Sequence, residues 1–578
     1  PSGINNTVQS PSRRNFLCDS SKLAGLVGTT SLFVPSHNSA QNQNKIKNNE
    51  LRNVPTENNY LIRGAYVVSM DNELQNKPAA DILIRDGVIV EISESIDATH
   101  LEVIEANNMI AIPGFVDSHW HLWNSTLKNM LRPDTSYFPL KQAFVDHFTP
   151  ADHYAANRLA LIEAAHAGIT TLNNFAHATQ TPEHVSEELR AMAESGIGGR
   201  YSYGWPDPTP DTNMMPILNI EHVKREWFDS DTPFEGKVDM GMAVRGPMYT
   251  ERNIYQREIE AARSLEIPVI MHVGSANRRY ASCAQLRNEG LLDSSTIVVH
   301  GIVQTPEDRT AIAETGCSLS FSIESELRLQ EDGDFRNQLL NMINENVNLS
   351  CSVDSSALSG ISMFDAMSTT WAYGIPWNGT ETQYFPKLSF HQVLEMATIN
   401  GAKALGIDAI TGSLTPGKRA DIILVRADDI NMTPVGNVET ALVHSATVAN
   451  VDTVIASGKV LKHAGEIISM DEASIKEDAK RSLFDLRQRV GGEDLQRELE
   501  HSESTLDIEE GRVLRCLRVA KLRIHRPGSD QVLIEARQIM ADGRERERGD
   551  VPGEKILAGE DPVEAALRGA REELADKF

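Results

Sequence analysis

The stretch Ile112-Pro113-Gly114-Phe115-Val116-Asp117-Ser118-His119-Trp120-His121 places two histidines at the end of a short apolar run. Its β-branched and aromatic residues predict a buried strand, and side chains two positions apart on a strand face the same side. His119 and His121 can therefore point together at one metal ion. A single histidine at a strand end is more often a polar packing residue, so this interpretation depends on what the rest of the chain adds.

Further β-rich runs follow, and helical stretches separate them. The runs are Ile169–Phe175, Gly199–Gly204, Val238–Val244, Pro268–Val273, Thr296–Gly301, Ser318–Ile323 and Asn348–Val353. Together with Ile110–Asp117 they make eight βα units, which predicts an α/β fold with a (β/α)8 barrel of the TIM type. An open doubly wound sheet is the competing topology, but it usually has fewer strands and a Gly-rich first turn, and no GxGxxG motif occurs here.

Three of the later strands end on residues that can bind a metal. His272 ends the fifth strand, His300 the sixth and Asp354 the eighth. The carboxyl ends of parallel barrel strands meet at one face, so these side chains should converge with the first two histidines. Imidazoles and one carboxylate suit Zn²⁺, the expected ion, or Fe²⁺, with one position left open for water.

At these residues the chain resembles the amidohydrolase superfamily, in the branch of cytosine deaminase and the triazine and methylthioadenosine deaminases or chlorohydrolases. The segments 112–121 and 412–421 carry the resemblance, which covers about residues 59–465. It implies that His300 contacts the activated water or the substrate, and that one divalent metal is bound by His119, His121, His272 and Asp354. Members with two metals often carry a carboxylated lysine on the fourth strand. Lys237 stands at the wrong end of that strand, so a single metal is expected.

The expected reaction is hydrolysis of a carbon–nitrogen bond other than a peptide bond, in a cyclic amide or an amidine-type ring. Asp354 and His300 are the expected catalytic residues: Asp354 would take the proton of the attacking water, and His300 would stabilise the developing negative oxygen. The deaminases carry a glutamate three residues after the strand-five histidine, whereas this chain has Ser275 there. A serine hydroxyl is no general base near neutral pH, which leaves Asp354, together with His300, to move the proton.

Three further residues are candidates for binding a small planar nitrogen heterocycle or cyclic amide. His177 ends the second strand, Trp123 follows the metal motif, and Arg245 follows the fourth strand. His177 could equally support the site from behind, Trp123 could stack on the substrate, and Arg245 could equally form a structural ion pair.

The domain organisation expected from the sequence has five parts. They are a leader over 1–57, a small composite β-sandwich from 58–110 and 406–465, the barrel over 111–405, a charged linker or helix over 466–510, and an α+β extension over 511–578. The leader contains Arg13-Arg14 before Phe16-Leu17, which resembles a twin-arginine export signal. The protein is periplasmic if that signal is real and cytoplasmic if the leader is a chance pattern.

Two alternatives to the barrel enzyme stay open. Glu560, Arg568 and Glu572-Glu573 resemble the Nudix box of Mg²⁺-dependent diphosphate hydrolases, but Gly569 stands where the box has glutamate. An ordinary acidic amphipathic helix explains the same residues. The other alternative is a barrel kept as a non-catalytic scaffold, which the complete set of candidate ligands disfavours.

Composition limits the partners. The net charge of −26 disfavours nucleic acid, and no apolar run reaches the roughly 18–20 residues of a membrane span. Five scattered cysteines form no CxxC pair and no disulfide framework. A small-molecule substrate is the expected partner, and assembly as a homo-oligomer is left open.

Overall fold

The computed structural model describes residues 54–55, 58–131, 136–229, 232–274, 281–329, 335–374 and 388–491, followed by six short strands between 504 and 555. The expected (β/α)8 barrel is confirmed. Its strands pair in parallel and in chain order. They are β6 (Phe115–Trp120), β7 (Ile169–Ala176), β8 (Gly198–Tyr203), β9 (Val238–Ala243), β10 (Val269–His272), β11 (Thr296–Val299), β12 (Ser318–Phe321) and β13 (Asn348–Cys351).

The first and last strands of the barrel are joined at His119, His121 and Asp354, three of the candidate metal ligands. Beyond β13, the backbone N–H of Asp354 donates to the carbonyl of His119 at 2.9 Å, and the N–H of His121 donates to the carbonyl of Asp354 at 2.6 Å. These two bonds join the end of the last strand to the end of the first. Closure of the barrel therefore holds Asp354 directly beside both histidines.

Helices surround the barrel, and several begin and end at residues typical of helix termini. Thr149 and Thr305 each form a capping box before a proline, and Gly168 and Gly316 end the same helices in the left-handed conformation. The longer helices are α2 (Tyr137–Phe144), α3 (Pro150–Ala167), α4 (Pro182–Ser195), α5 (Ile217–Trp227), α7 (Arg252–Ser264), α9 (Pro306–Thr315), α11 (Phe335–Asn344), α12 (Met363–Gly374) and α13 (Phe390–Ala397). The short ones are η1 (Leu122–Leu127), η2 (Val145–His147), α6 (Gly246–Tyr249), α8 (Cys283–Asn288), α10 (Ile323–Leu329), α14 (Ile399–Ala404), α15 (Val438–Thr440), η3 (Ala441–Ser445) and η4 (Val448–Asn450).

Both flanks of the barrel sequence build one nine-stranded mixed sheet with its own apolar core. Its strands are β1 (Tyr60–Val67), β2 (Lys77–Arg85), β3 (Val88–Ser93), β4 (Glu102–Glu105), β5 (Met109–Pro113), β14 (Ile422–Arg426), β15 (Val451–Ala456), β16 (Lys459–His463) and β17 (Glu466–Ile467).

The run Ile110–Asp117, expected as a single barrel strand, is split between the two sheets: β5 pairs with β1 and β14, and β6 opens the barrel. Gly114 separates them. A Cβ there would lie 2.0 Å from Oγ1 of Thr170, so only glycine fits the crossing.

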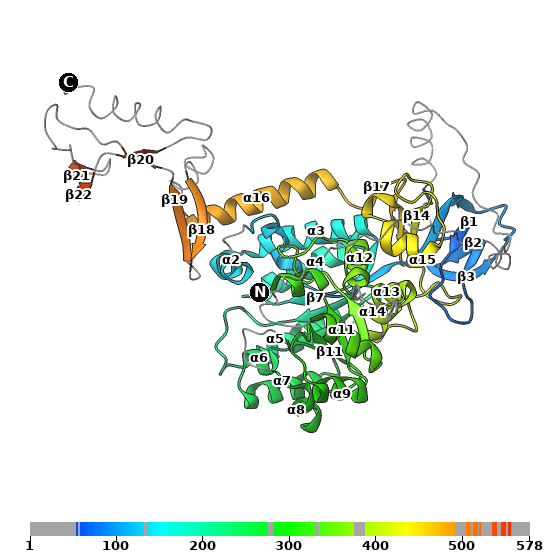
Figure 1. The fold of residues 1–578 in the computed structure, drawn as a ribbon, viewed down its shortest axis with the longest axis horizontal. Coiled ribbons are helices and arrows are strands. Elements are labelled where there is room, and N and C mark those ends of the chain that lie inside the picture. Colours follow the sequence, from blue (N-terminus) through cyan, green and yellow to red (C-terminus); the bar gives the residue numbers. More distant parts are fainter. Residues whose placement is uncertain are drawn as a thin grey trace, which may run out of the picture.

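The charged segment after the mixed sheet contains a helix that packs on the barrel. Helix α16 (Glu472–Gly491) runs along α3 (Figure 1). Ser482 Oγ donates to Asp152 Oδ1 at 2.7 Å, and Arg158 forms a 2.9 Å ion pair with Asp478. Leu486 is fully buried in an apolar cluster that also contains Trp123. This helix therefore supports the barrel from the side on which Trp123 lies.

The six later strands form three antiparallel pairs: β18 (Ser504–Glu509) with β19 (Arg512–Leu517), β20 (Val519–Lys521) with β23 (Gly553–Lys555), and β21 (Glu535–Ile539) with β22 (Glu545–Asp550). The leader, its paired arginines and the Nudix-like residues lie outside the described residues. Among the helices that are described, none has the length and apolar character needed to cross a membrane. Cys283, Cys317 and Cys351 are buried and unpaired.

Candidate active site

A buried carboxylate fixes the backbone of the first histidine motif. Asp117 accepts the N–H of His119 at 3.0 Å and the N–H of Val353 at 3.1 Å, so it joins the ends of β6 and β13. Burial raises the pKa of Asp117 well above its usual range, although both hydrogen bonds act against that rise. Asp117 therefore fixes the backbone that carries His119 and His121, and it is not among the residues that line the cavity.

The four residues expected to bind a metal come together. Nε2 of His119 and Nε2 of His121 lie 3.3 and 3.4 Å from the same oxygen, Oδ1 of Asp354. Nitrogen atoms of His119, His121 and His272 lie within 4.8 Å of one another, as do the candidate ligand atoms of His119, His300 and Asp354. The barrel thus brings all five strand-end residues into one cluster.

The chemistry of this cluster fits a divalent metal. Burial lowers the pKa of His119, His121 and His272, which favours neutral imidazoles. Burial would raise the pKa of Asp354, but its close contact with His119 and the neighbouring imidazoles outweigh burial and hold that pKa well below its usual range. Neutral imidazoles and an ionised carboxylate are the forms that bind Zn²⁺ or Fe²⁺. Nδ1 of His272 is moreover buried without a hydrogen-bond partner among the described residues.

His300 occupies an unusual backbone position. Its φ of 74° lies in the left-handed region, which a residue with a side chain seldom adopts, and its N–H donates to the carbonyl of Ser320 at 2.9 Å. Its Nδ1 lies 2.9 Å from Oε1 of Glu326. Burial alone would lower the pKa of His300, but Glu326 and Asp354 outweigh burial and raise it.

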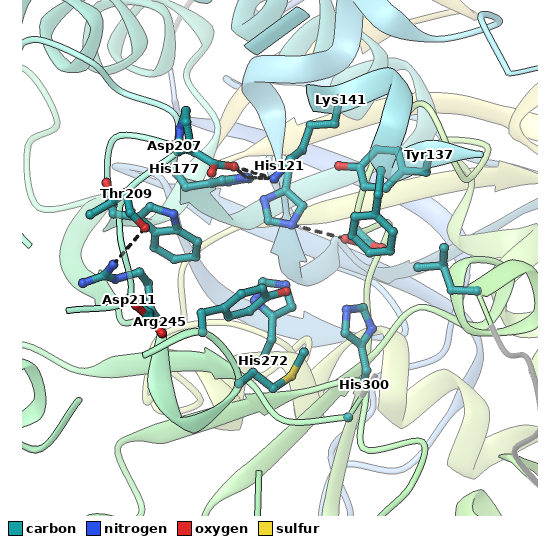
Figure 2. Close-up of a pocket in the computed structure, with 18 of the residues that line it drawn as sticks. His121, Tyr137, Lys141, His177, Asp207, Thr209, Asp211, Arg245, His272 and His300 are labelled. Atoms are coloured by element: carbon teal, nitrogen blue, oxygen red, sulfur yellow. Dashed lines mark hydrogen bonds and ion pairs between the residues drawn. The ribbon is translucent and has the colours of Figure 1, made fainter. Parts of the chain in front are cut away.

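A cavity of about 510 Å³ opens above the cluster. Figure 2 shows the imidazoles of His121, His272 and His300 gathered in it, with His177 and Asp207 beside His121. Its apolar and aromatic lining comes from Tyr137, Phe138, Trp205, Met248, Tyr249, Ile302 and Leu329. A flat ring can therefore be enclosed between aromatic walls and brought against the histidines.

The three candidate substrate-binding residues occupy different places. His177 lines the cavity, and its Nε2 faces Nζ of Lys141 at 3.5 Å. Trp123 is fully buried and lies behind His177, with its Nε1 donating to Nδ1 of His177 at 3.2 Å. The indole is thus not placed among the cavity-lining side chains, and stacking of Trp123 on a substrate has no support in this geometry.

Arg245 lines the cavity but is held by protein groups. It forms a buried 2.9 Å ion pair with Glu258, and its Nη1 donates to the carbonyl of Pro210 at 2.9 Å. Its Nη1 also donates to the carbonyl of Thr209 at 3.4 Å (Figure 2). A further bond reaches the carbonyl of Asn213. These bonds occupy both terminal nitrogens, so the structural ion pair is the role that the geometry favours for this arginine.

Sequence reasoning did not single out three charged residues of the cavity. Lys141 and Asp207 form a 2.5 Å ion pair on its wall, and Glu326 contacts His300. Lys141 lies on α2 and Asp207 in the loop after β8, so no periodic pattern marks them. Glu326 lies four residues after Ser322, and a search for acids just beyond each strand would have found it. Ser275 lies outside the described residues.

The parallel barrel with a histidine and aspartate cluster at its carboxyl ends defines a hydrolase barrel built to hold a metal. The chain belongs to the amidohydrolase family, whose model matches residues 110–461. It is 28% identical over 418 residues to 5'-deoxyadenosine deaminase of Methanosphaera stadtmanae, covering 69% of this chain and 94% of that protein. It is also 28% identical over 390 residues to 5-methylthioadenosine/S-adenosylhomocysteine deaminase of Moorella thermoacetica, covering 64% and 86%.

Solved structures share the fold. An adenosine deaminase from Xanthomonas campestris with bound zinc matches with a TM-score of 0.65 and 21% identity, over 75% of this chain and all of that one. An atrazine chlorohydrolase from Arthrobacter aurescens, also with zinc, matches with a TM-score of 0.64 and 20% identity, over 73% of this chain and all of that one. Family membership and the deaminase relatives confirm the expected class, a hydrolase that acts on carbon–nitrogen bonds other than peptide bonds.

Proposed function

We propose that the protein is a zinc-dependent deaminase of an aminated purine carried on a nucleoside-type group. The observation that carries the proposal is the shared contact of His119 and His121 with Oδ1 of Asp354 at the base of an aromatic cavity. The relatives named as deaminases of 5'-deoxyadenosine and methylthioadenosine favour an adenosine-like ring over a cyclic amide.

His119, His121, His272 and Asp354 would hold the metal. When bound, such an ion lowers the pKa of water toward about 7 and acts as a Lewis acid. Asp354 lies at the centre of the cluster, where its carboxylate can orient the attacking water and accept a proton from it. His300 borders the cavity and can hydrogen-bond the oxygen that develops negative charge.

The opposite wall suits the polar part of the substrate. Lys141 and Asp207 place an ammonium and a carboxylate side by side, so this wall offers both donors and acceptors to hydroxyl groups. His177 lies between this pair and the cluster, since its ring centroid is 4.6 Å from that of His121. We assign His177 to substrate binding as a hydrogen-bond donor.

Ammonia release tests the proposal. The zinc-loaded protein is incubated with adenosine, 5'-deoxyadenosine, methylthioadenosine, cytosine, an amino-triazine and a cyclic ureide, and ammonia and ring-opened product are measured. We expect ammonia from the adenosine-type substrates at the highest kcat/KM. Ring opening of the ureide without ammonia release from any aminated ring would overturn the proposal in favour of a cyclic amidase.

A further inference from the structure

The proposed deamination needs two proton transfers, and the chain lacks the usual second carboxylate. Addition of water at the ring carbon gives a tetrahedral adduct that bears a hydroxyl and an amino group. Asp354 takes the first proton of the water and returns it to the ring nitrogen. The hydroxyl proton must then reach the amino nitrogen. The carbon–nitrogen bond breaks with its electron pair going to nitrogen, the C=O bond forms, and neutral ammonia leaves. In the sequence, Ser275 stands where a glutamate would help with this work.

We propose that Glu326 is a positioning residue that holds His300 as the group passing this second proton to the leaving nitrogen. The inference rests on the proposed function. Oε1 of Glu326 lies 2.9 Å from Nδ1 of His300, and a carboxylate there accepts the Nδ1 proton. The other ring nitrogen, Nε2, is then the one left to exchange a proton, and His300 borders the cavity.

The carboxylate of Glu326 is itself held in place. The side chain is fully buried, and its Oε1 also accepts the backbone N–H of Ser322 at 3.0 Å. Its Oε2 is buried and has no hydrogen-bond partner among the described residues. A carboxylate held in this manner fixes both the tautomer and the rotation of the imidazole, as in other carboxylate–histidine pairs.

Two other carboxylates that line the cavity contact residues other than His300 at hydrogen-bond or ion-pair distance. Asp207 pairs with Lys141 at 2.5 Å, and Asp354 lies against His119 and His121. Glu326 is the cavity-lining carboxylate that the described residues bring into hydrogen-bond contact with His300. Its helix, α10, follows β12. Strand β12 pairs with β11, and His300 is the residue directly after β11.

The test combines Glu326→Gln, His300→Asn and the double variant, each assayed for kcat and KM after zinc loading. We expect Glu326→Gln to lose about 100-fold in kcat with little change in KM, within the range for a general acid. In the His300→Asn background the same change should cost less than about threefold, because Glu326 acts through His300. Glu324→Gln is the matched control: it lies on the same helix and accepts the N–H of Gly360.

A change of leaving group separates proton transfer from a structural effect. Chloride leaves without a proton, so Glu326→Gln should hydrolyse a 6-chloropurine nucleoside within about threefold of the unchanged protein. Equal losses on the amino and chloro substrates, or additive losses in the double variant, would overturn the inference. So would an unchanged kcat in Glu326→Gln. If the unchanged protein releases no ammonia from any aminated ring, the proposed function fails instead.

Discussion

Nε1 of Trp123 donates a 3.2 Å hydrogen bond to Nδ1 of His177. An indole N–H can only donate, so Nδ1 must accept. Burial lowers the pKa of His177 well below its usual value, and the nearby ammonium of Lys141 adds to this. A neutral imidazole has one acceptor nitrogen, and the 3.2 Å bond from Trp123 is shorter than the 3.5 Å approach of the Lys141 ammonium to Nε2. We therefore assign the proton of neutral His177 to Nε2, which lies 3.8 Å from Oδ2 of Asp207. Trp123 therefore fixes His177 as a hydrogen-bond donor without touching the substrate.

Replacing Trp123 by phenylalanine should release this constraint. Trp123→Phe keeps an aromatic ring in the core but removes the donor, so Nδ1 of His177 can take the proton and Nε2 can become an acceptor. We expect KM to rise by about three- to tenfold, the worth of one hydrogen bond, while kcat changes little. Trp371→Phe is the control, because that indole stacks on Phe390 away from the cavity. A lower kcat with unchanged KM would contradict this assignment.

Asp354 is expected to be indispensable because it would both bind the metal and accept the proton of the attacking water. Asp354→Asn replaces the carboxylate with a neutral amide, which binds a divalent metal poorly and cannot accept a proton. We expect turnover to fall by at least about 1,000-fold. Bound zinc, measured by mass spectrometry of the purified protein, should fall as well. Asp478→Asn on α16 serves as the control, and normal activity of Asp354→Asn would refute the proposed mechanism.

Removal of the metal should affect both activity and stability. A chelator should abolish ammonia release, and added Zn²⁺ should restore it. An ion that binds only the folded protein stabilises it by about 2.7 kcal/mol when its free concentration is 100 times Kd. Thermal unfolding should therefore shift upward as zinc is added to the depleted protein. A melting temperature and an activity that do not respond to zinc would argue for the scaffold alternative.

The ligand cluster could be predicted from sequence because each member lies at, or within three residues of, the carboxyl end of a barrel strand. In a parallel barrel that position decides where a side chain points, which is why His119 and Asp354 lie 3.3 Å apart although they are 235 positions apart in the sequence. The Lys141–Asp207 pair could not be predicted, because α2 and a loop carry it and their path depends on packing. The boundary between β5 and β6 at Gly114 could not be predicted either, because both strands are apolar and read as one continuous run in the sequence.

A pair at the edge of the barrel gives a pH-dependent contribution to stability. His391 on α13 lies 2.9 Å from Glu439, and their hydrogen bond raises the pKa of His391 and lowers that of Glu439. The contribution of His391 to the free energy of unfolding is fully present below about pH 6.5, its pKa in the unfolded chain. It is lost as the pH rises through the higher pKa that His391 has in the folded protein. The contribution of Glu439 is fully present above about pH 4.5, its pKa in the unfolded chain. It is lost as the pH falls through the lower pKa that Glu439 has in the folded protein.

The pair should therefore stabilise the fold most between about pH 4.5 and 6.5. Because both side chains are partly exposed, the effect should be about 0.5 kcal/mol. His391→Gln should lower the melting temperature at pH 5.5 and leave it nearly unchanged at pH 8.5. His100→Gln is a suitable control, since that histidine is exposed in the turn before β4. An equal loss at both pH values would show that packing, not charge, is what His391 contributes.

Helix α16 should prove to be part of the catalytic unit. Leu486 is fully buried against the cluster that contains Trp123, Tyr137 and Phe144, and Tyr137 also lines the cavity. Leu486→Ala leaves a cavity there, and such a change typically costs 2–5 kcal/mol. We expect the melting temperature to fall by several degrees and KM to rise, because Trp123 loses a neighbour that holds it against His177. Leu218→Ala, at a side chain that is 79% exposed, should change neither. If Leu486→Ala behaves like Leu218→Ala, the helix lies on the barrel without supporting it.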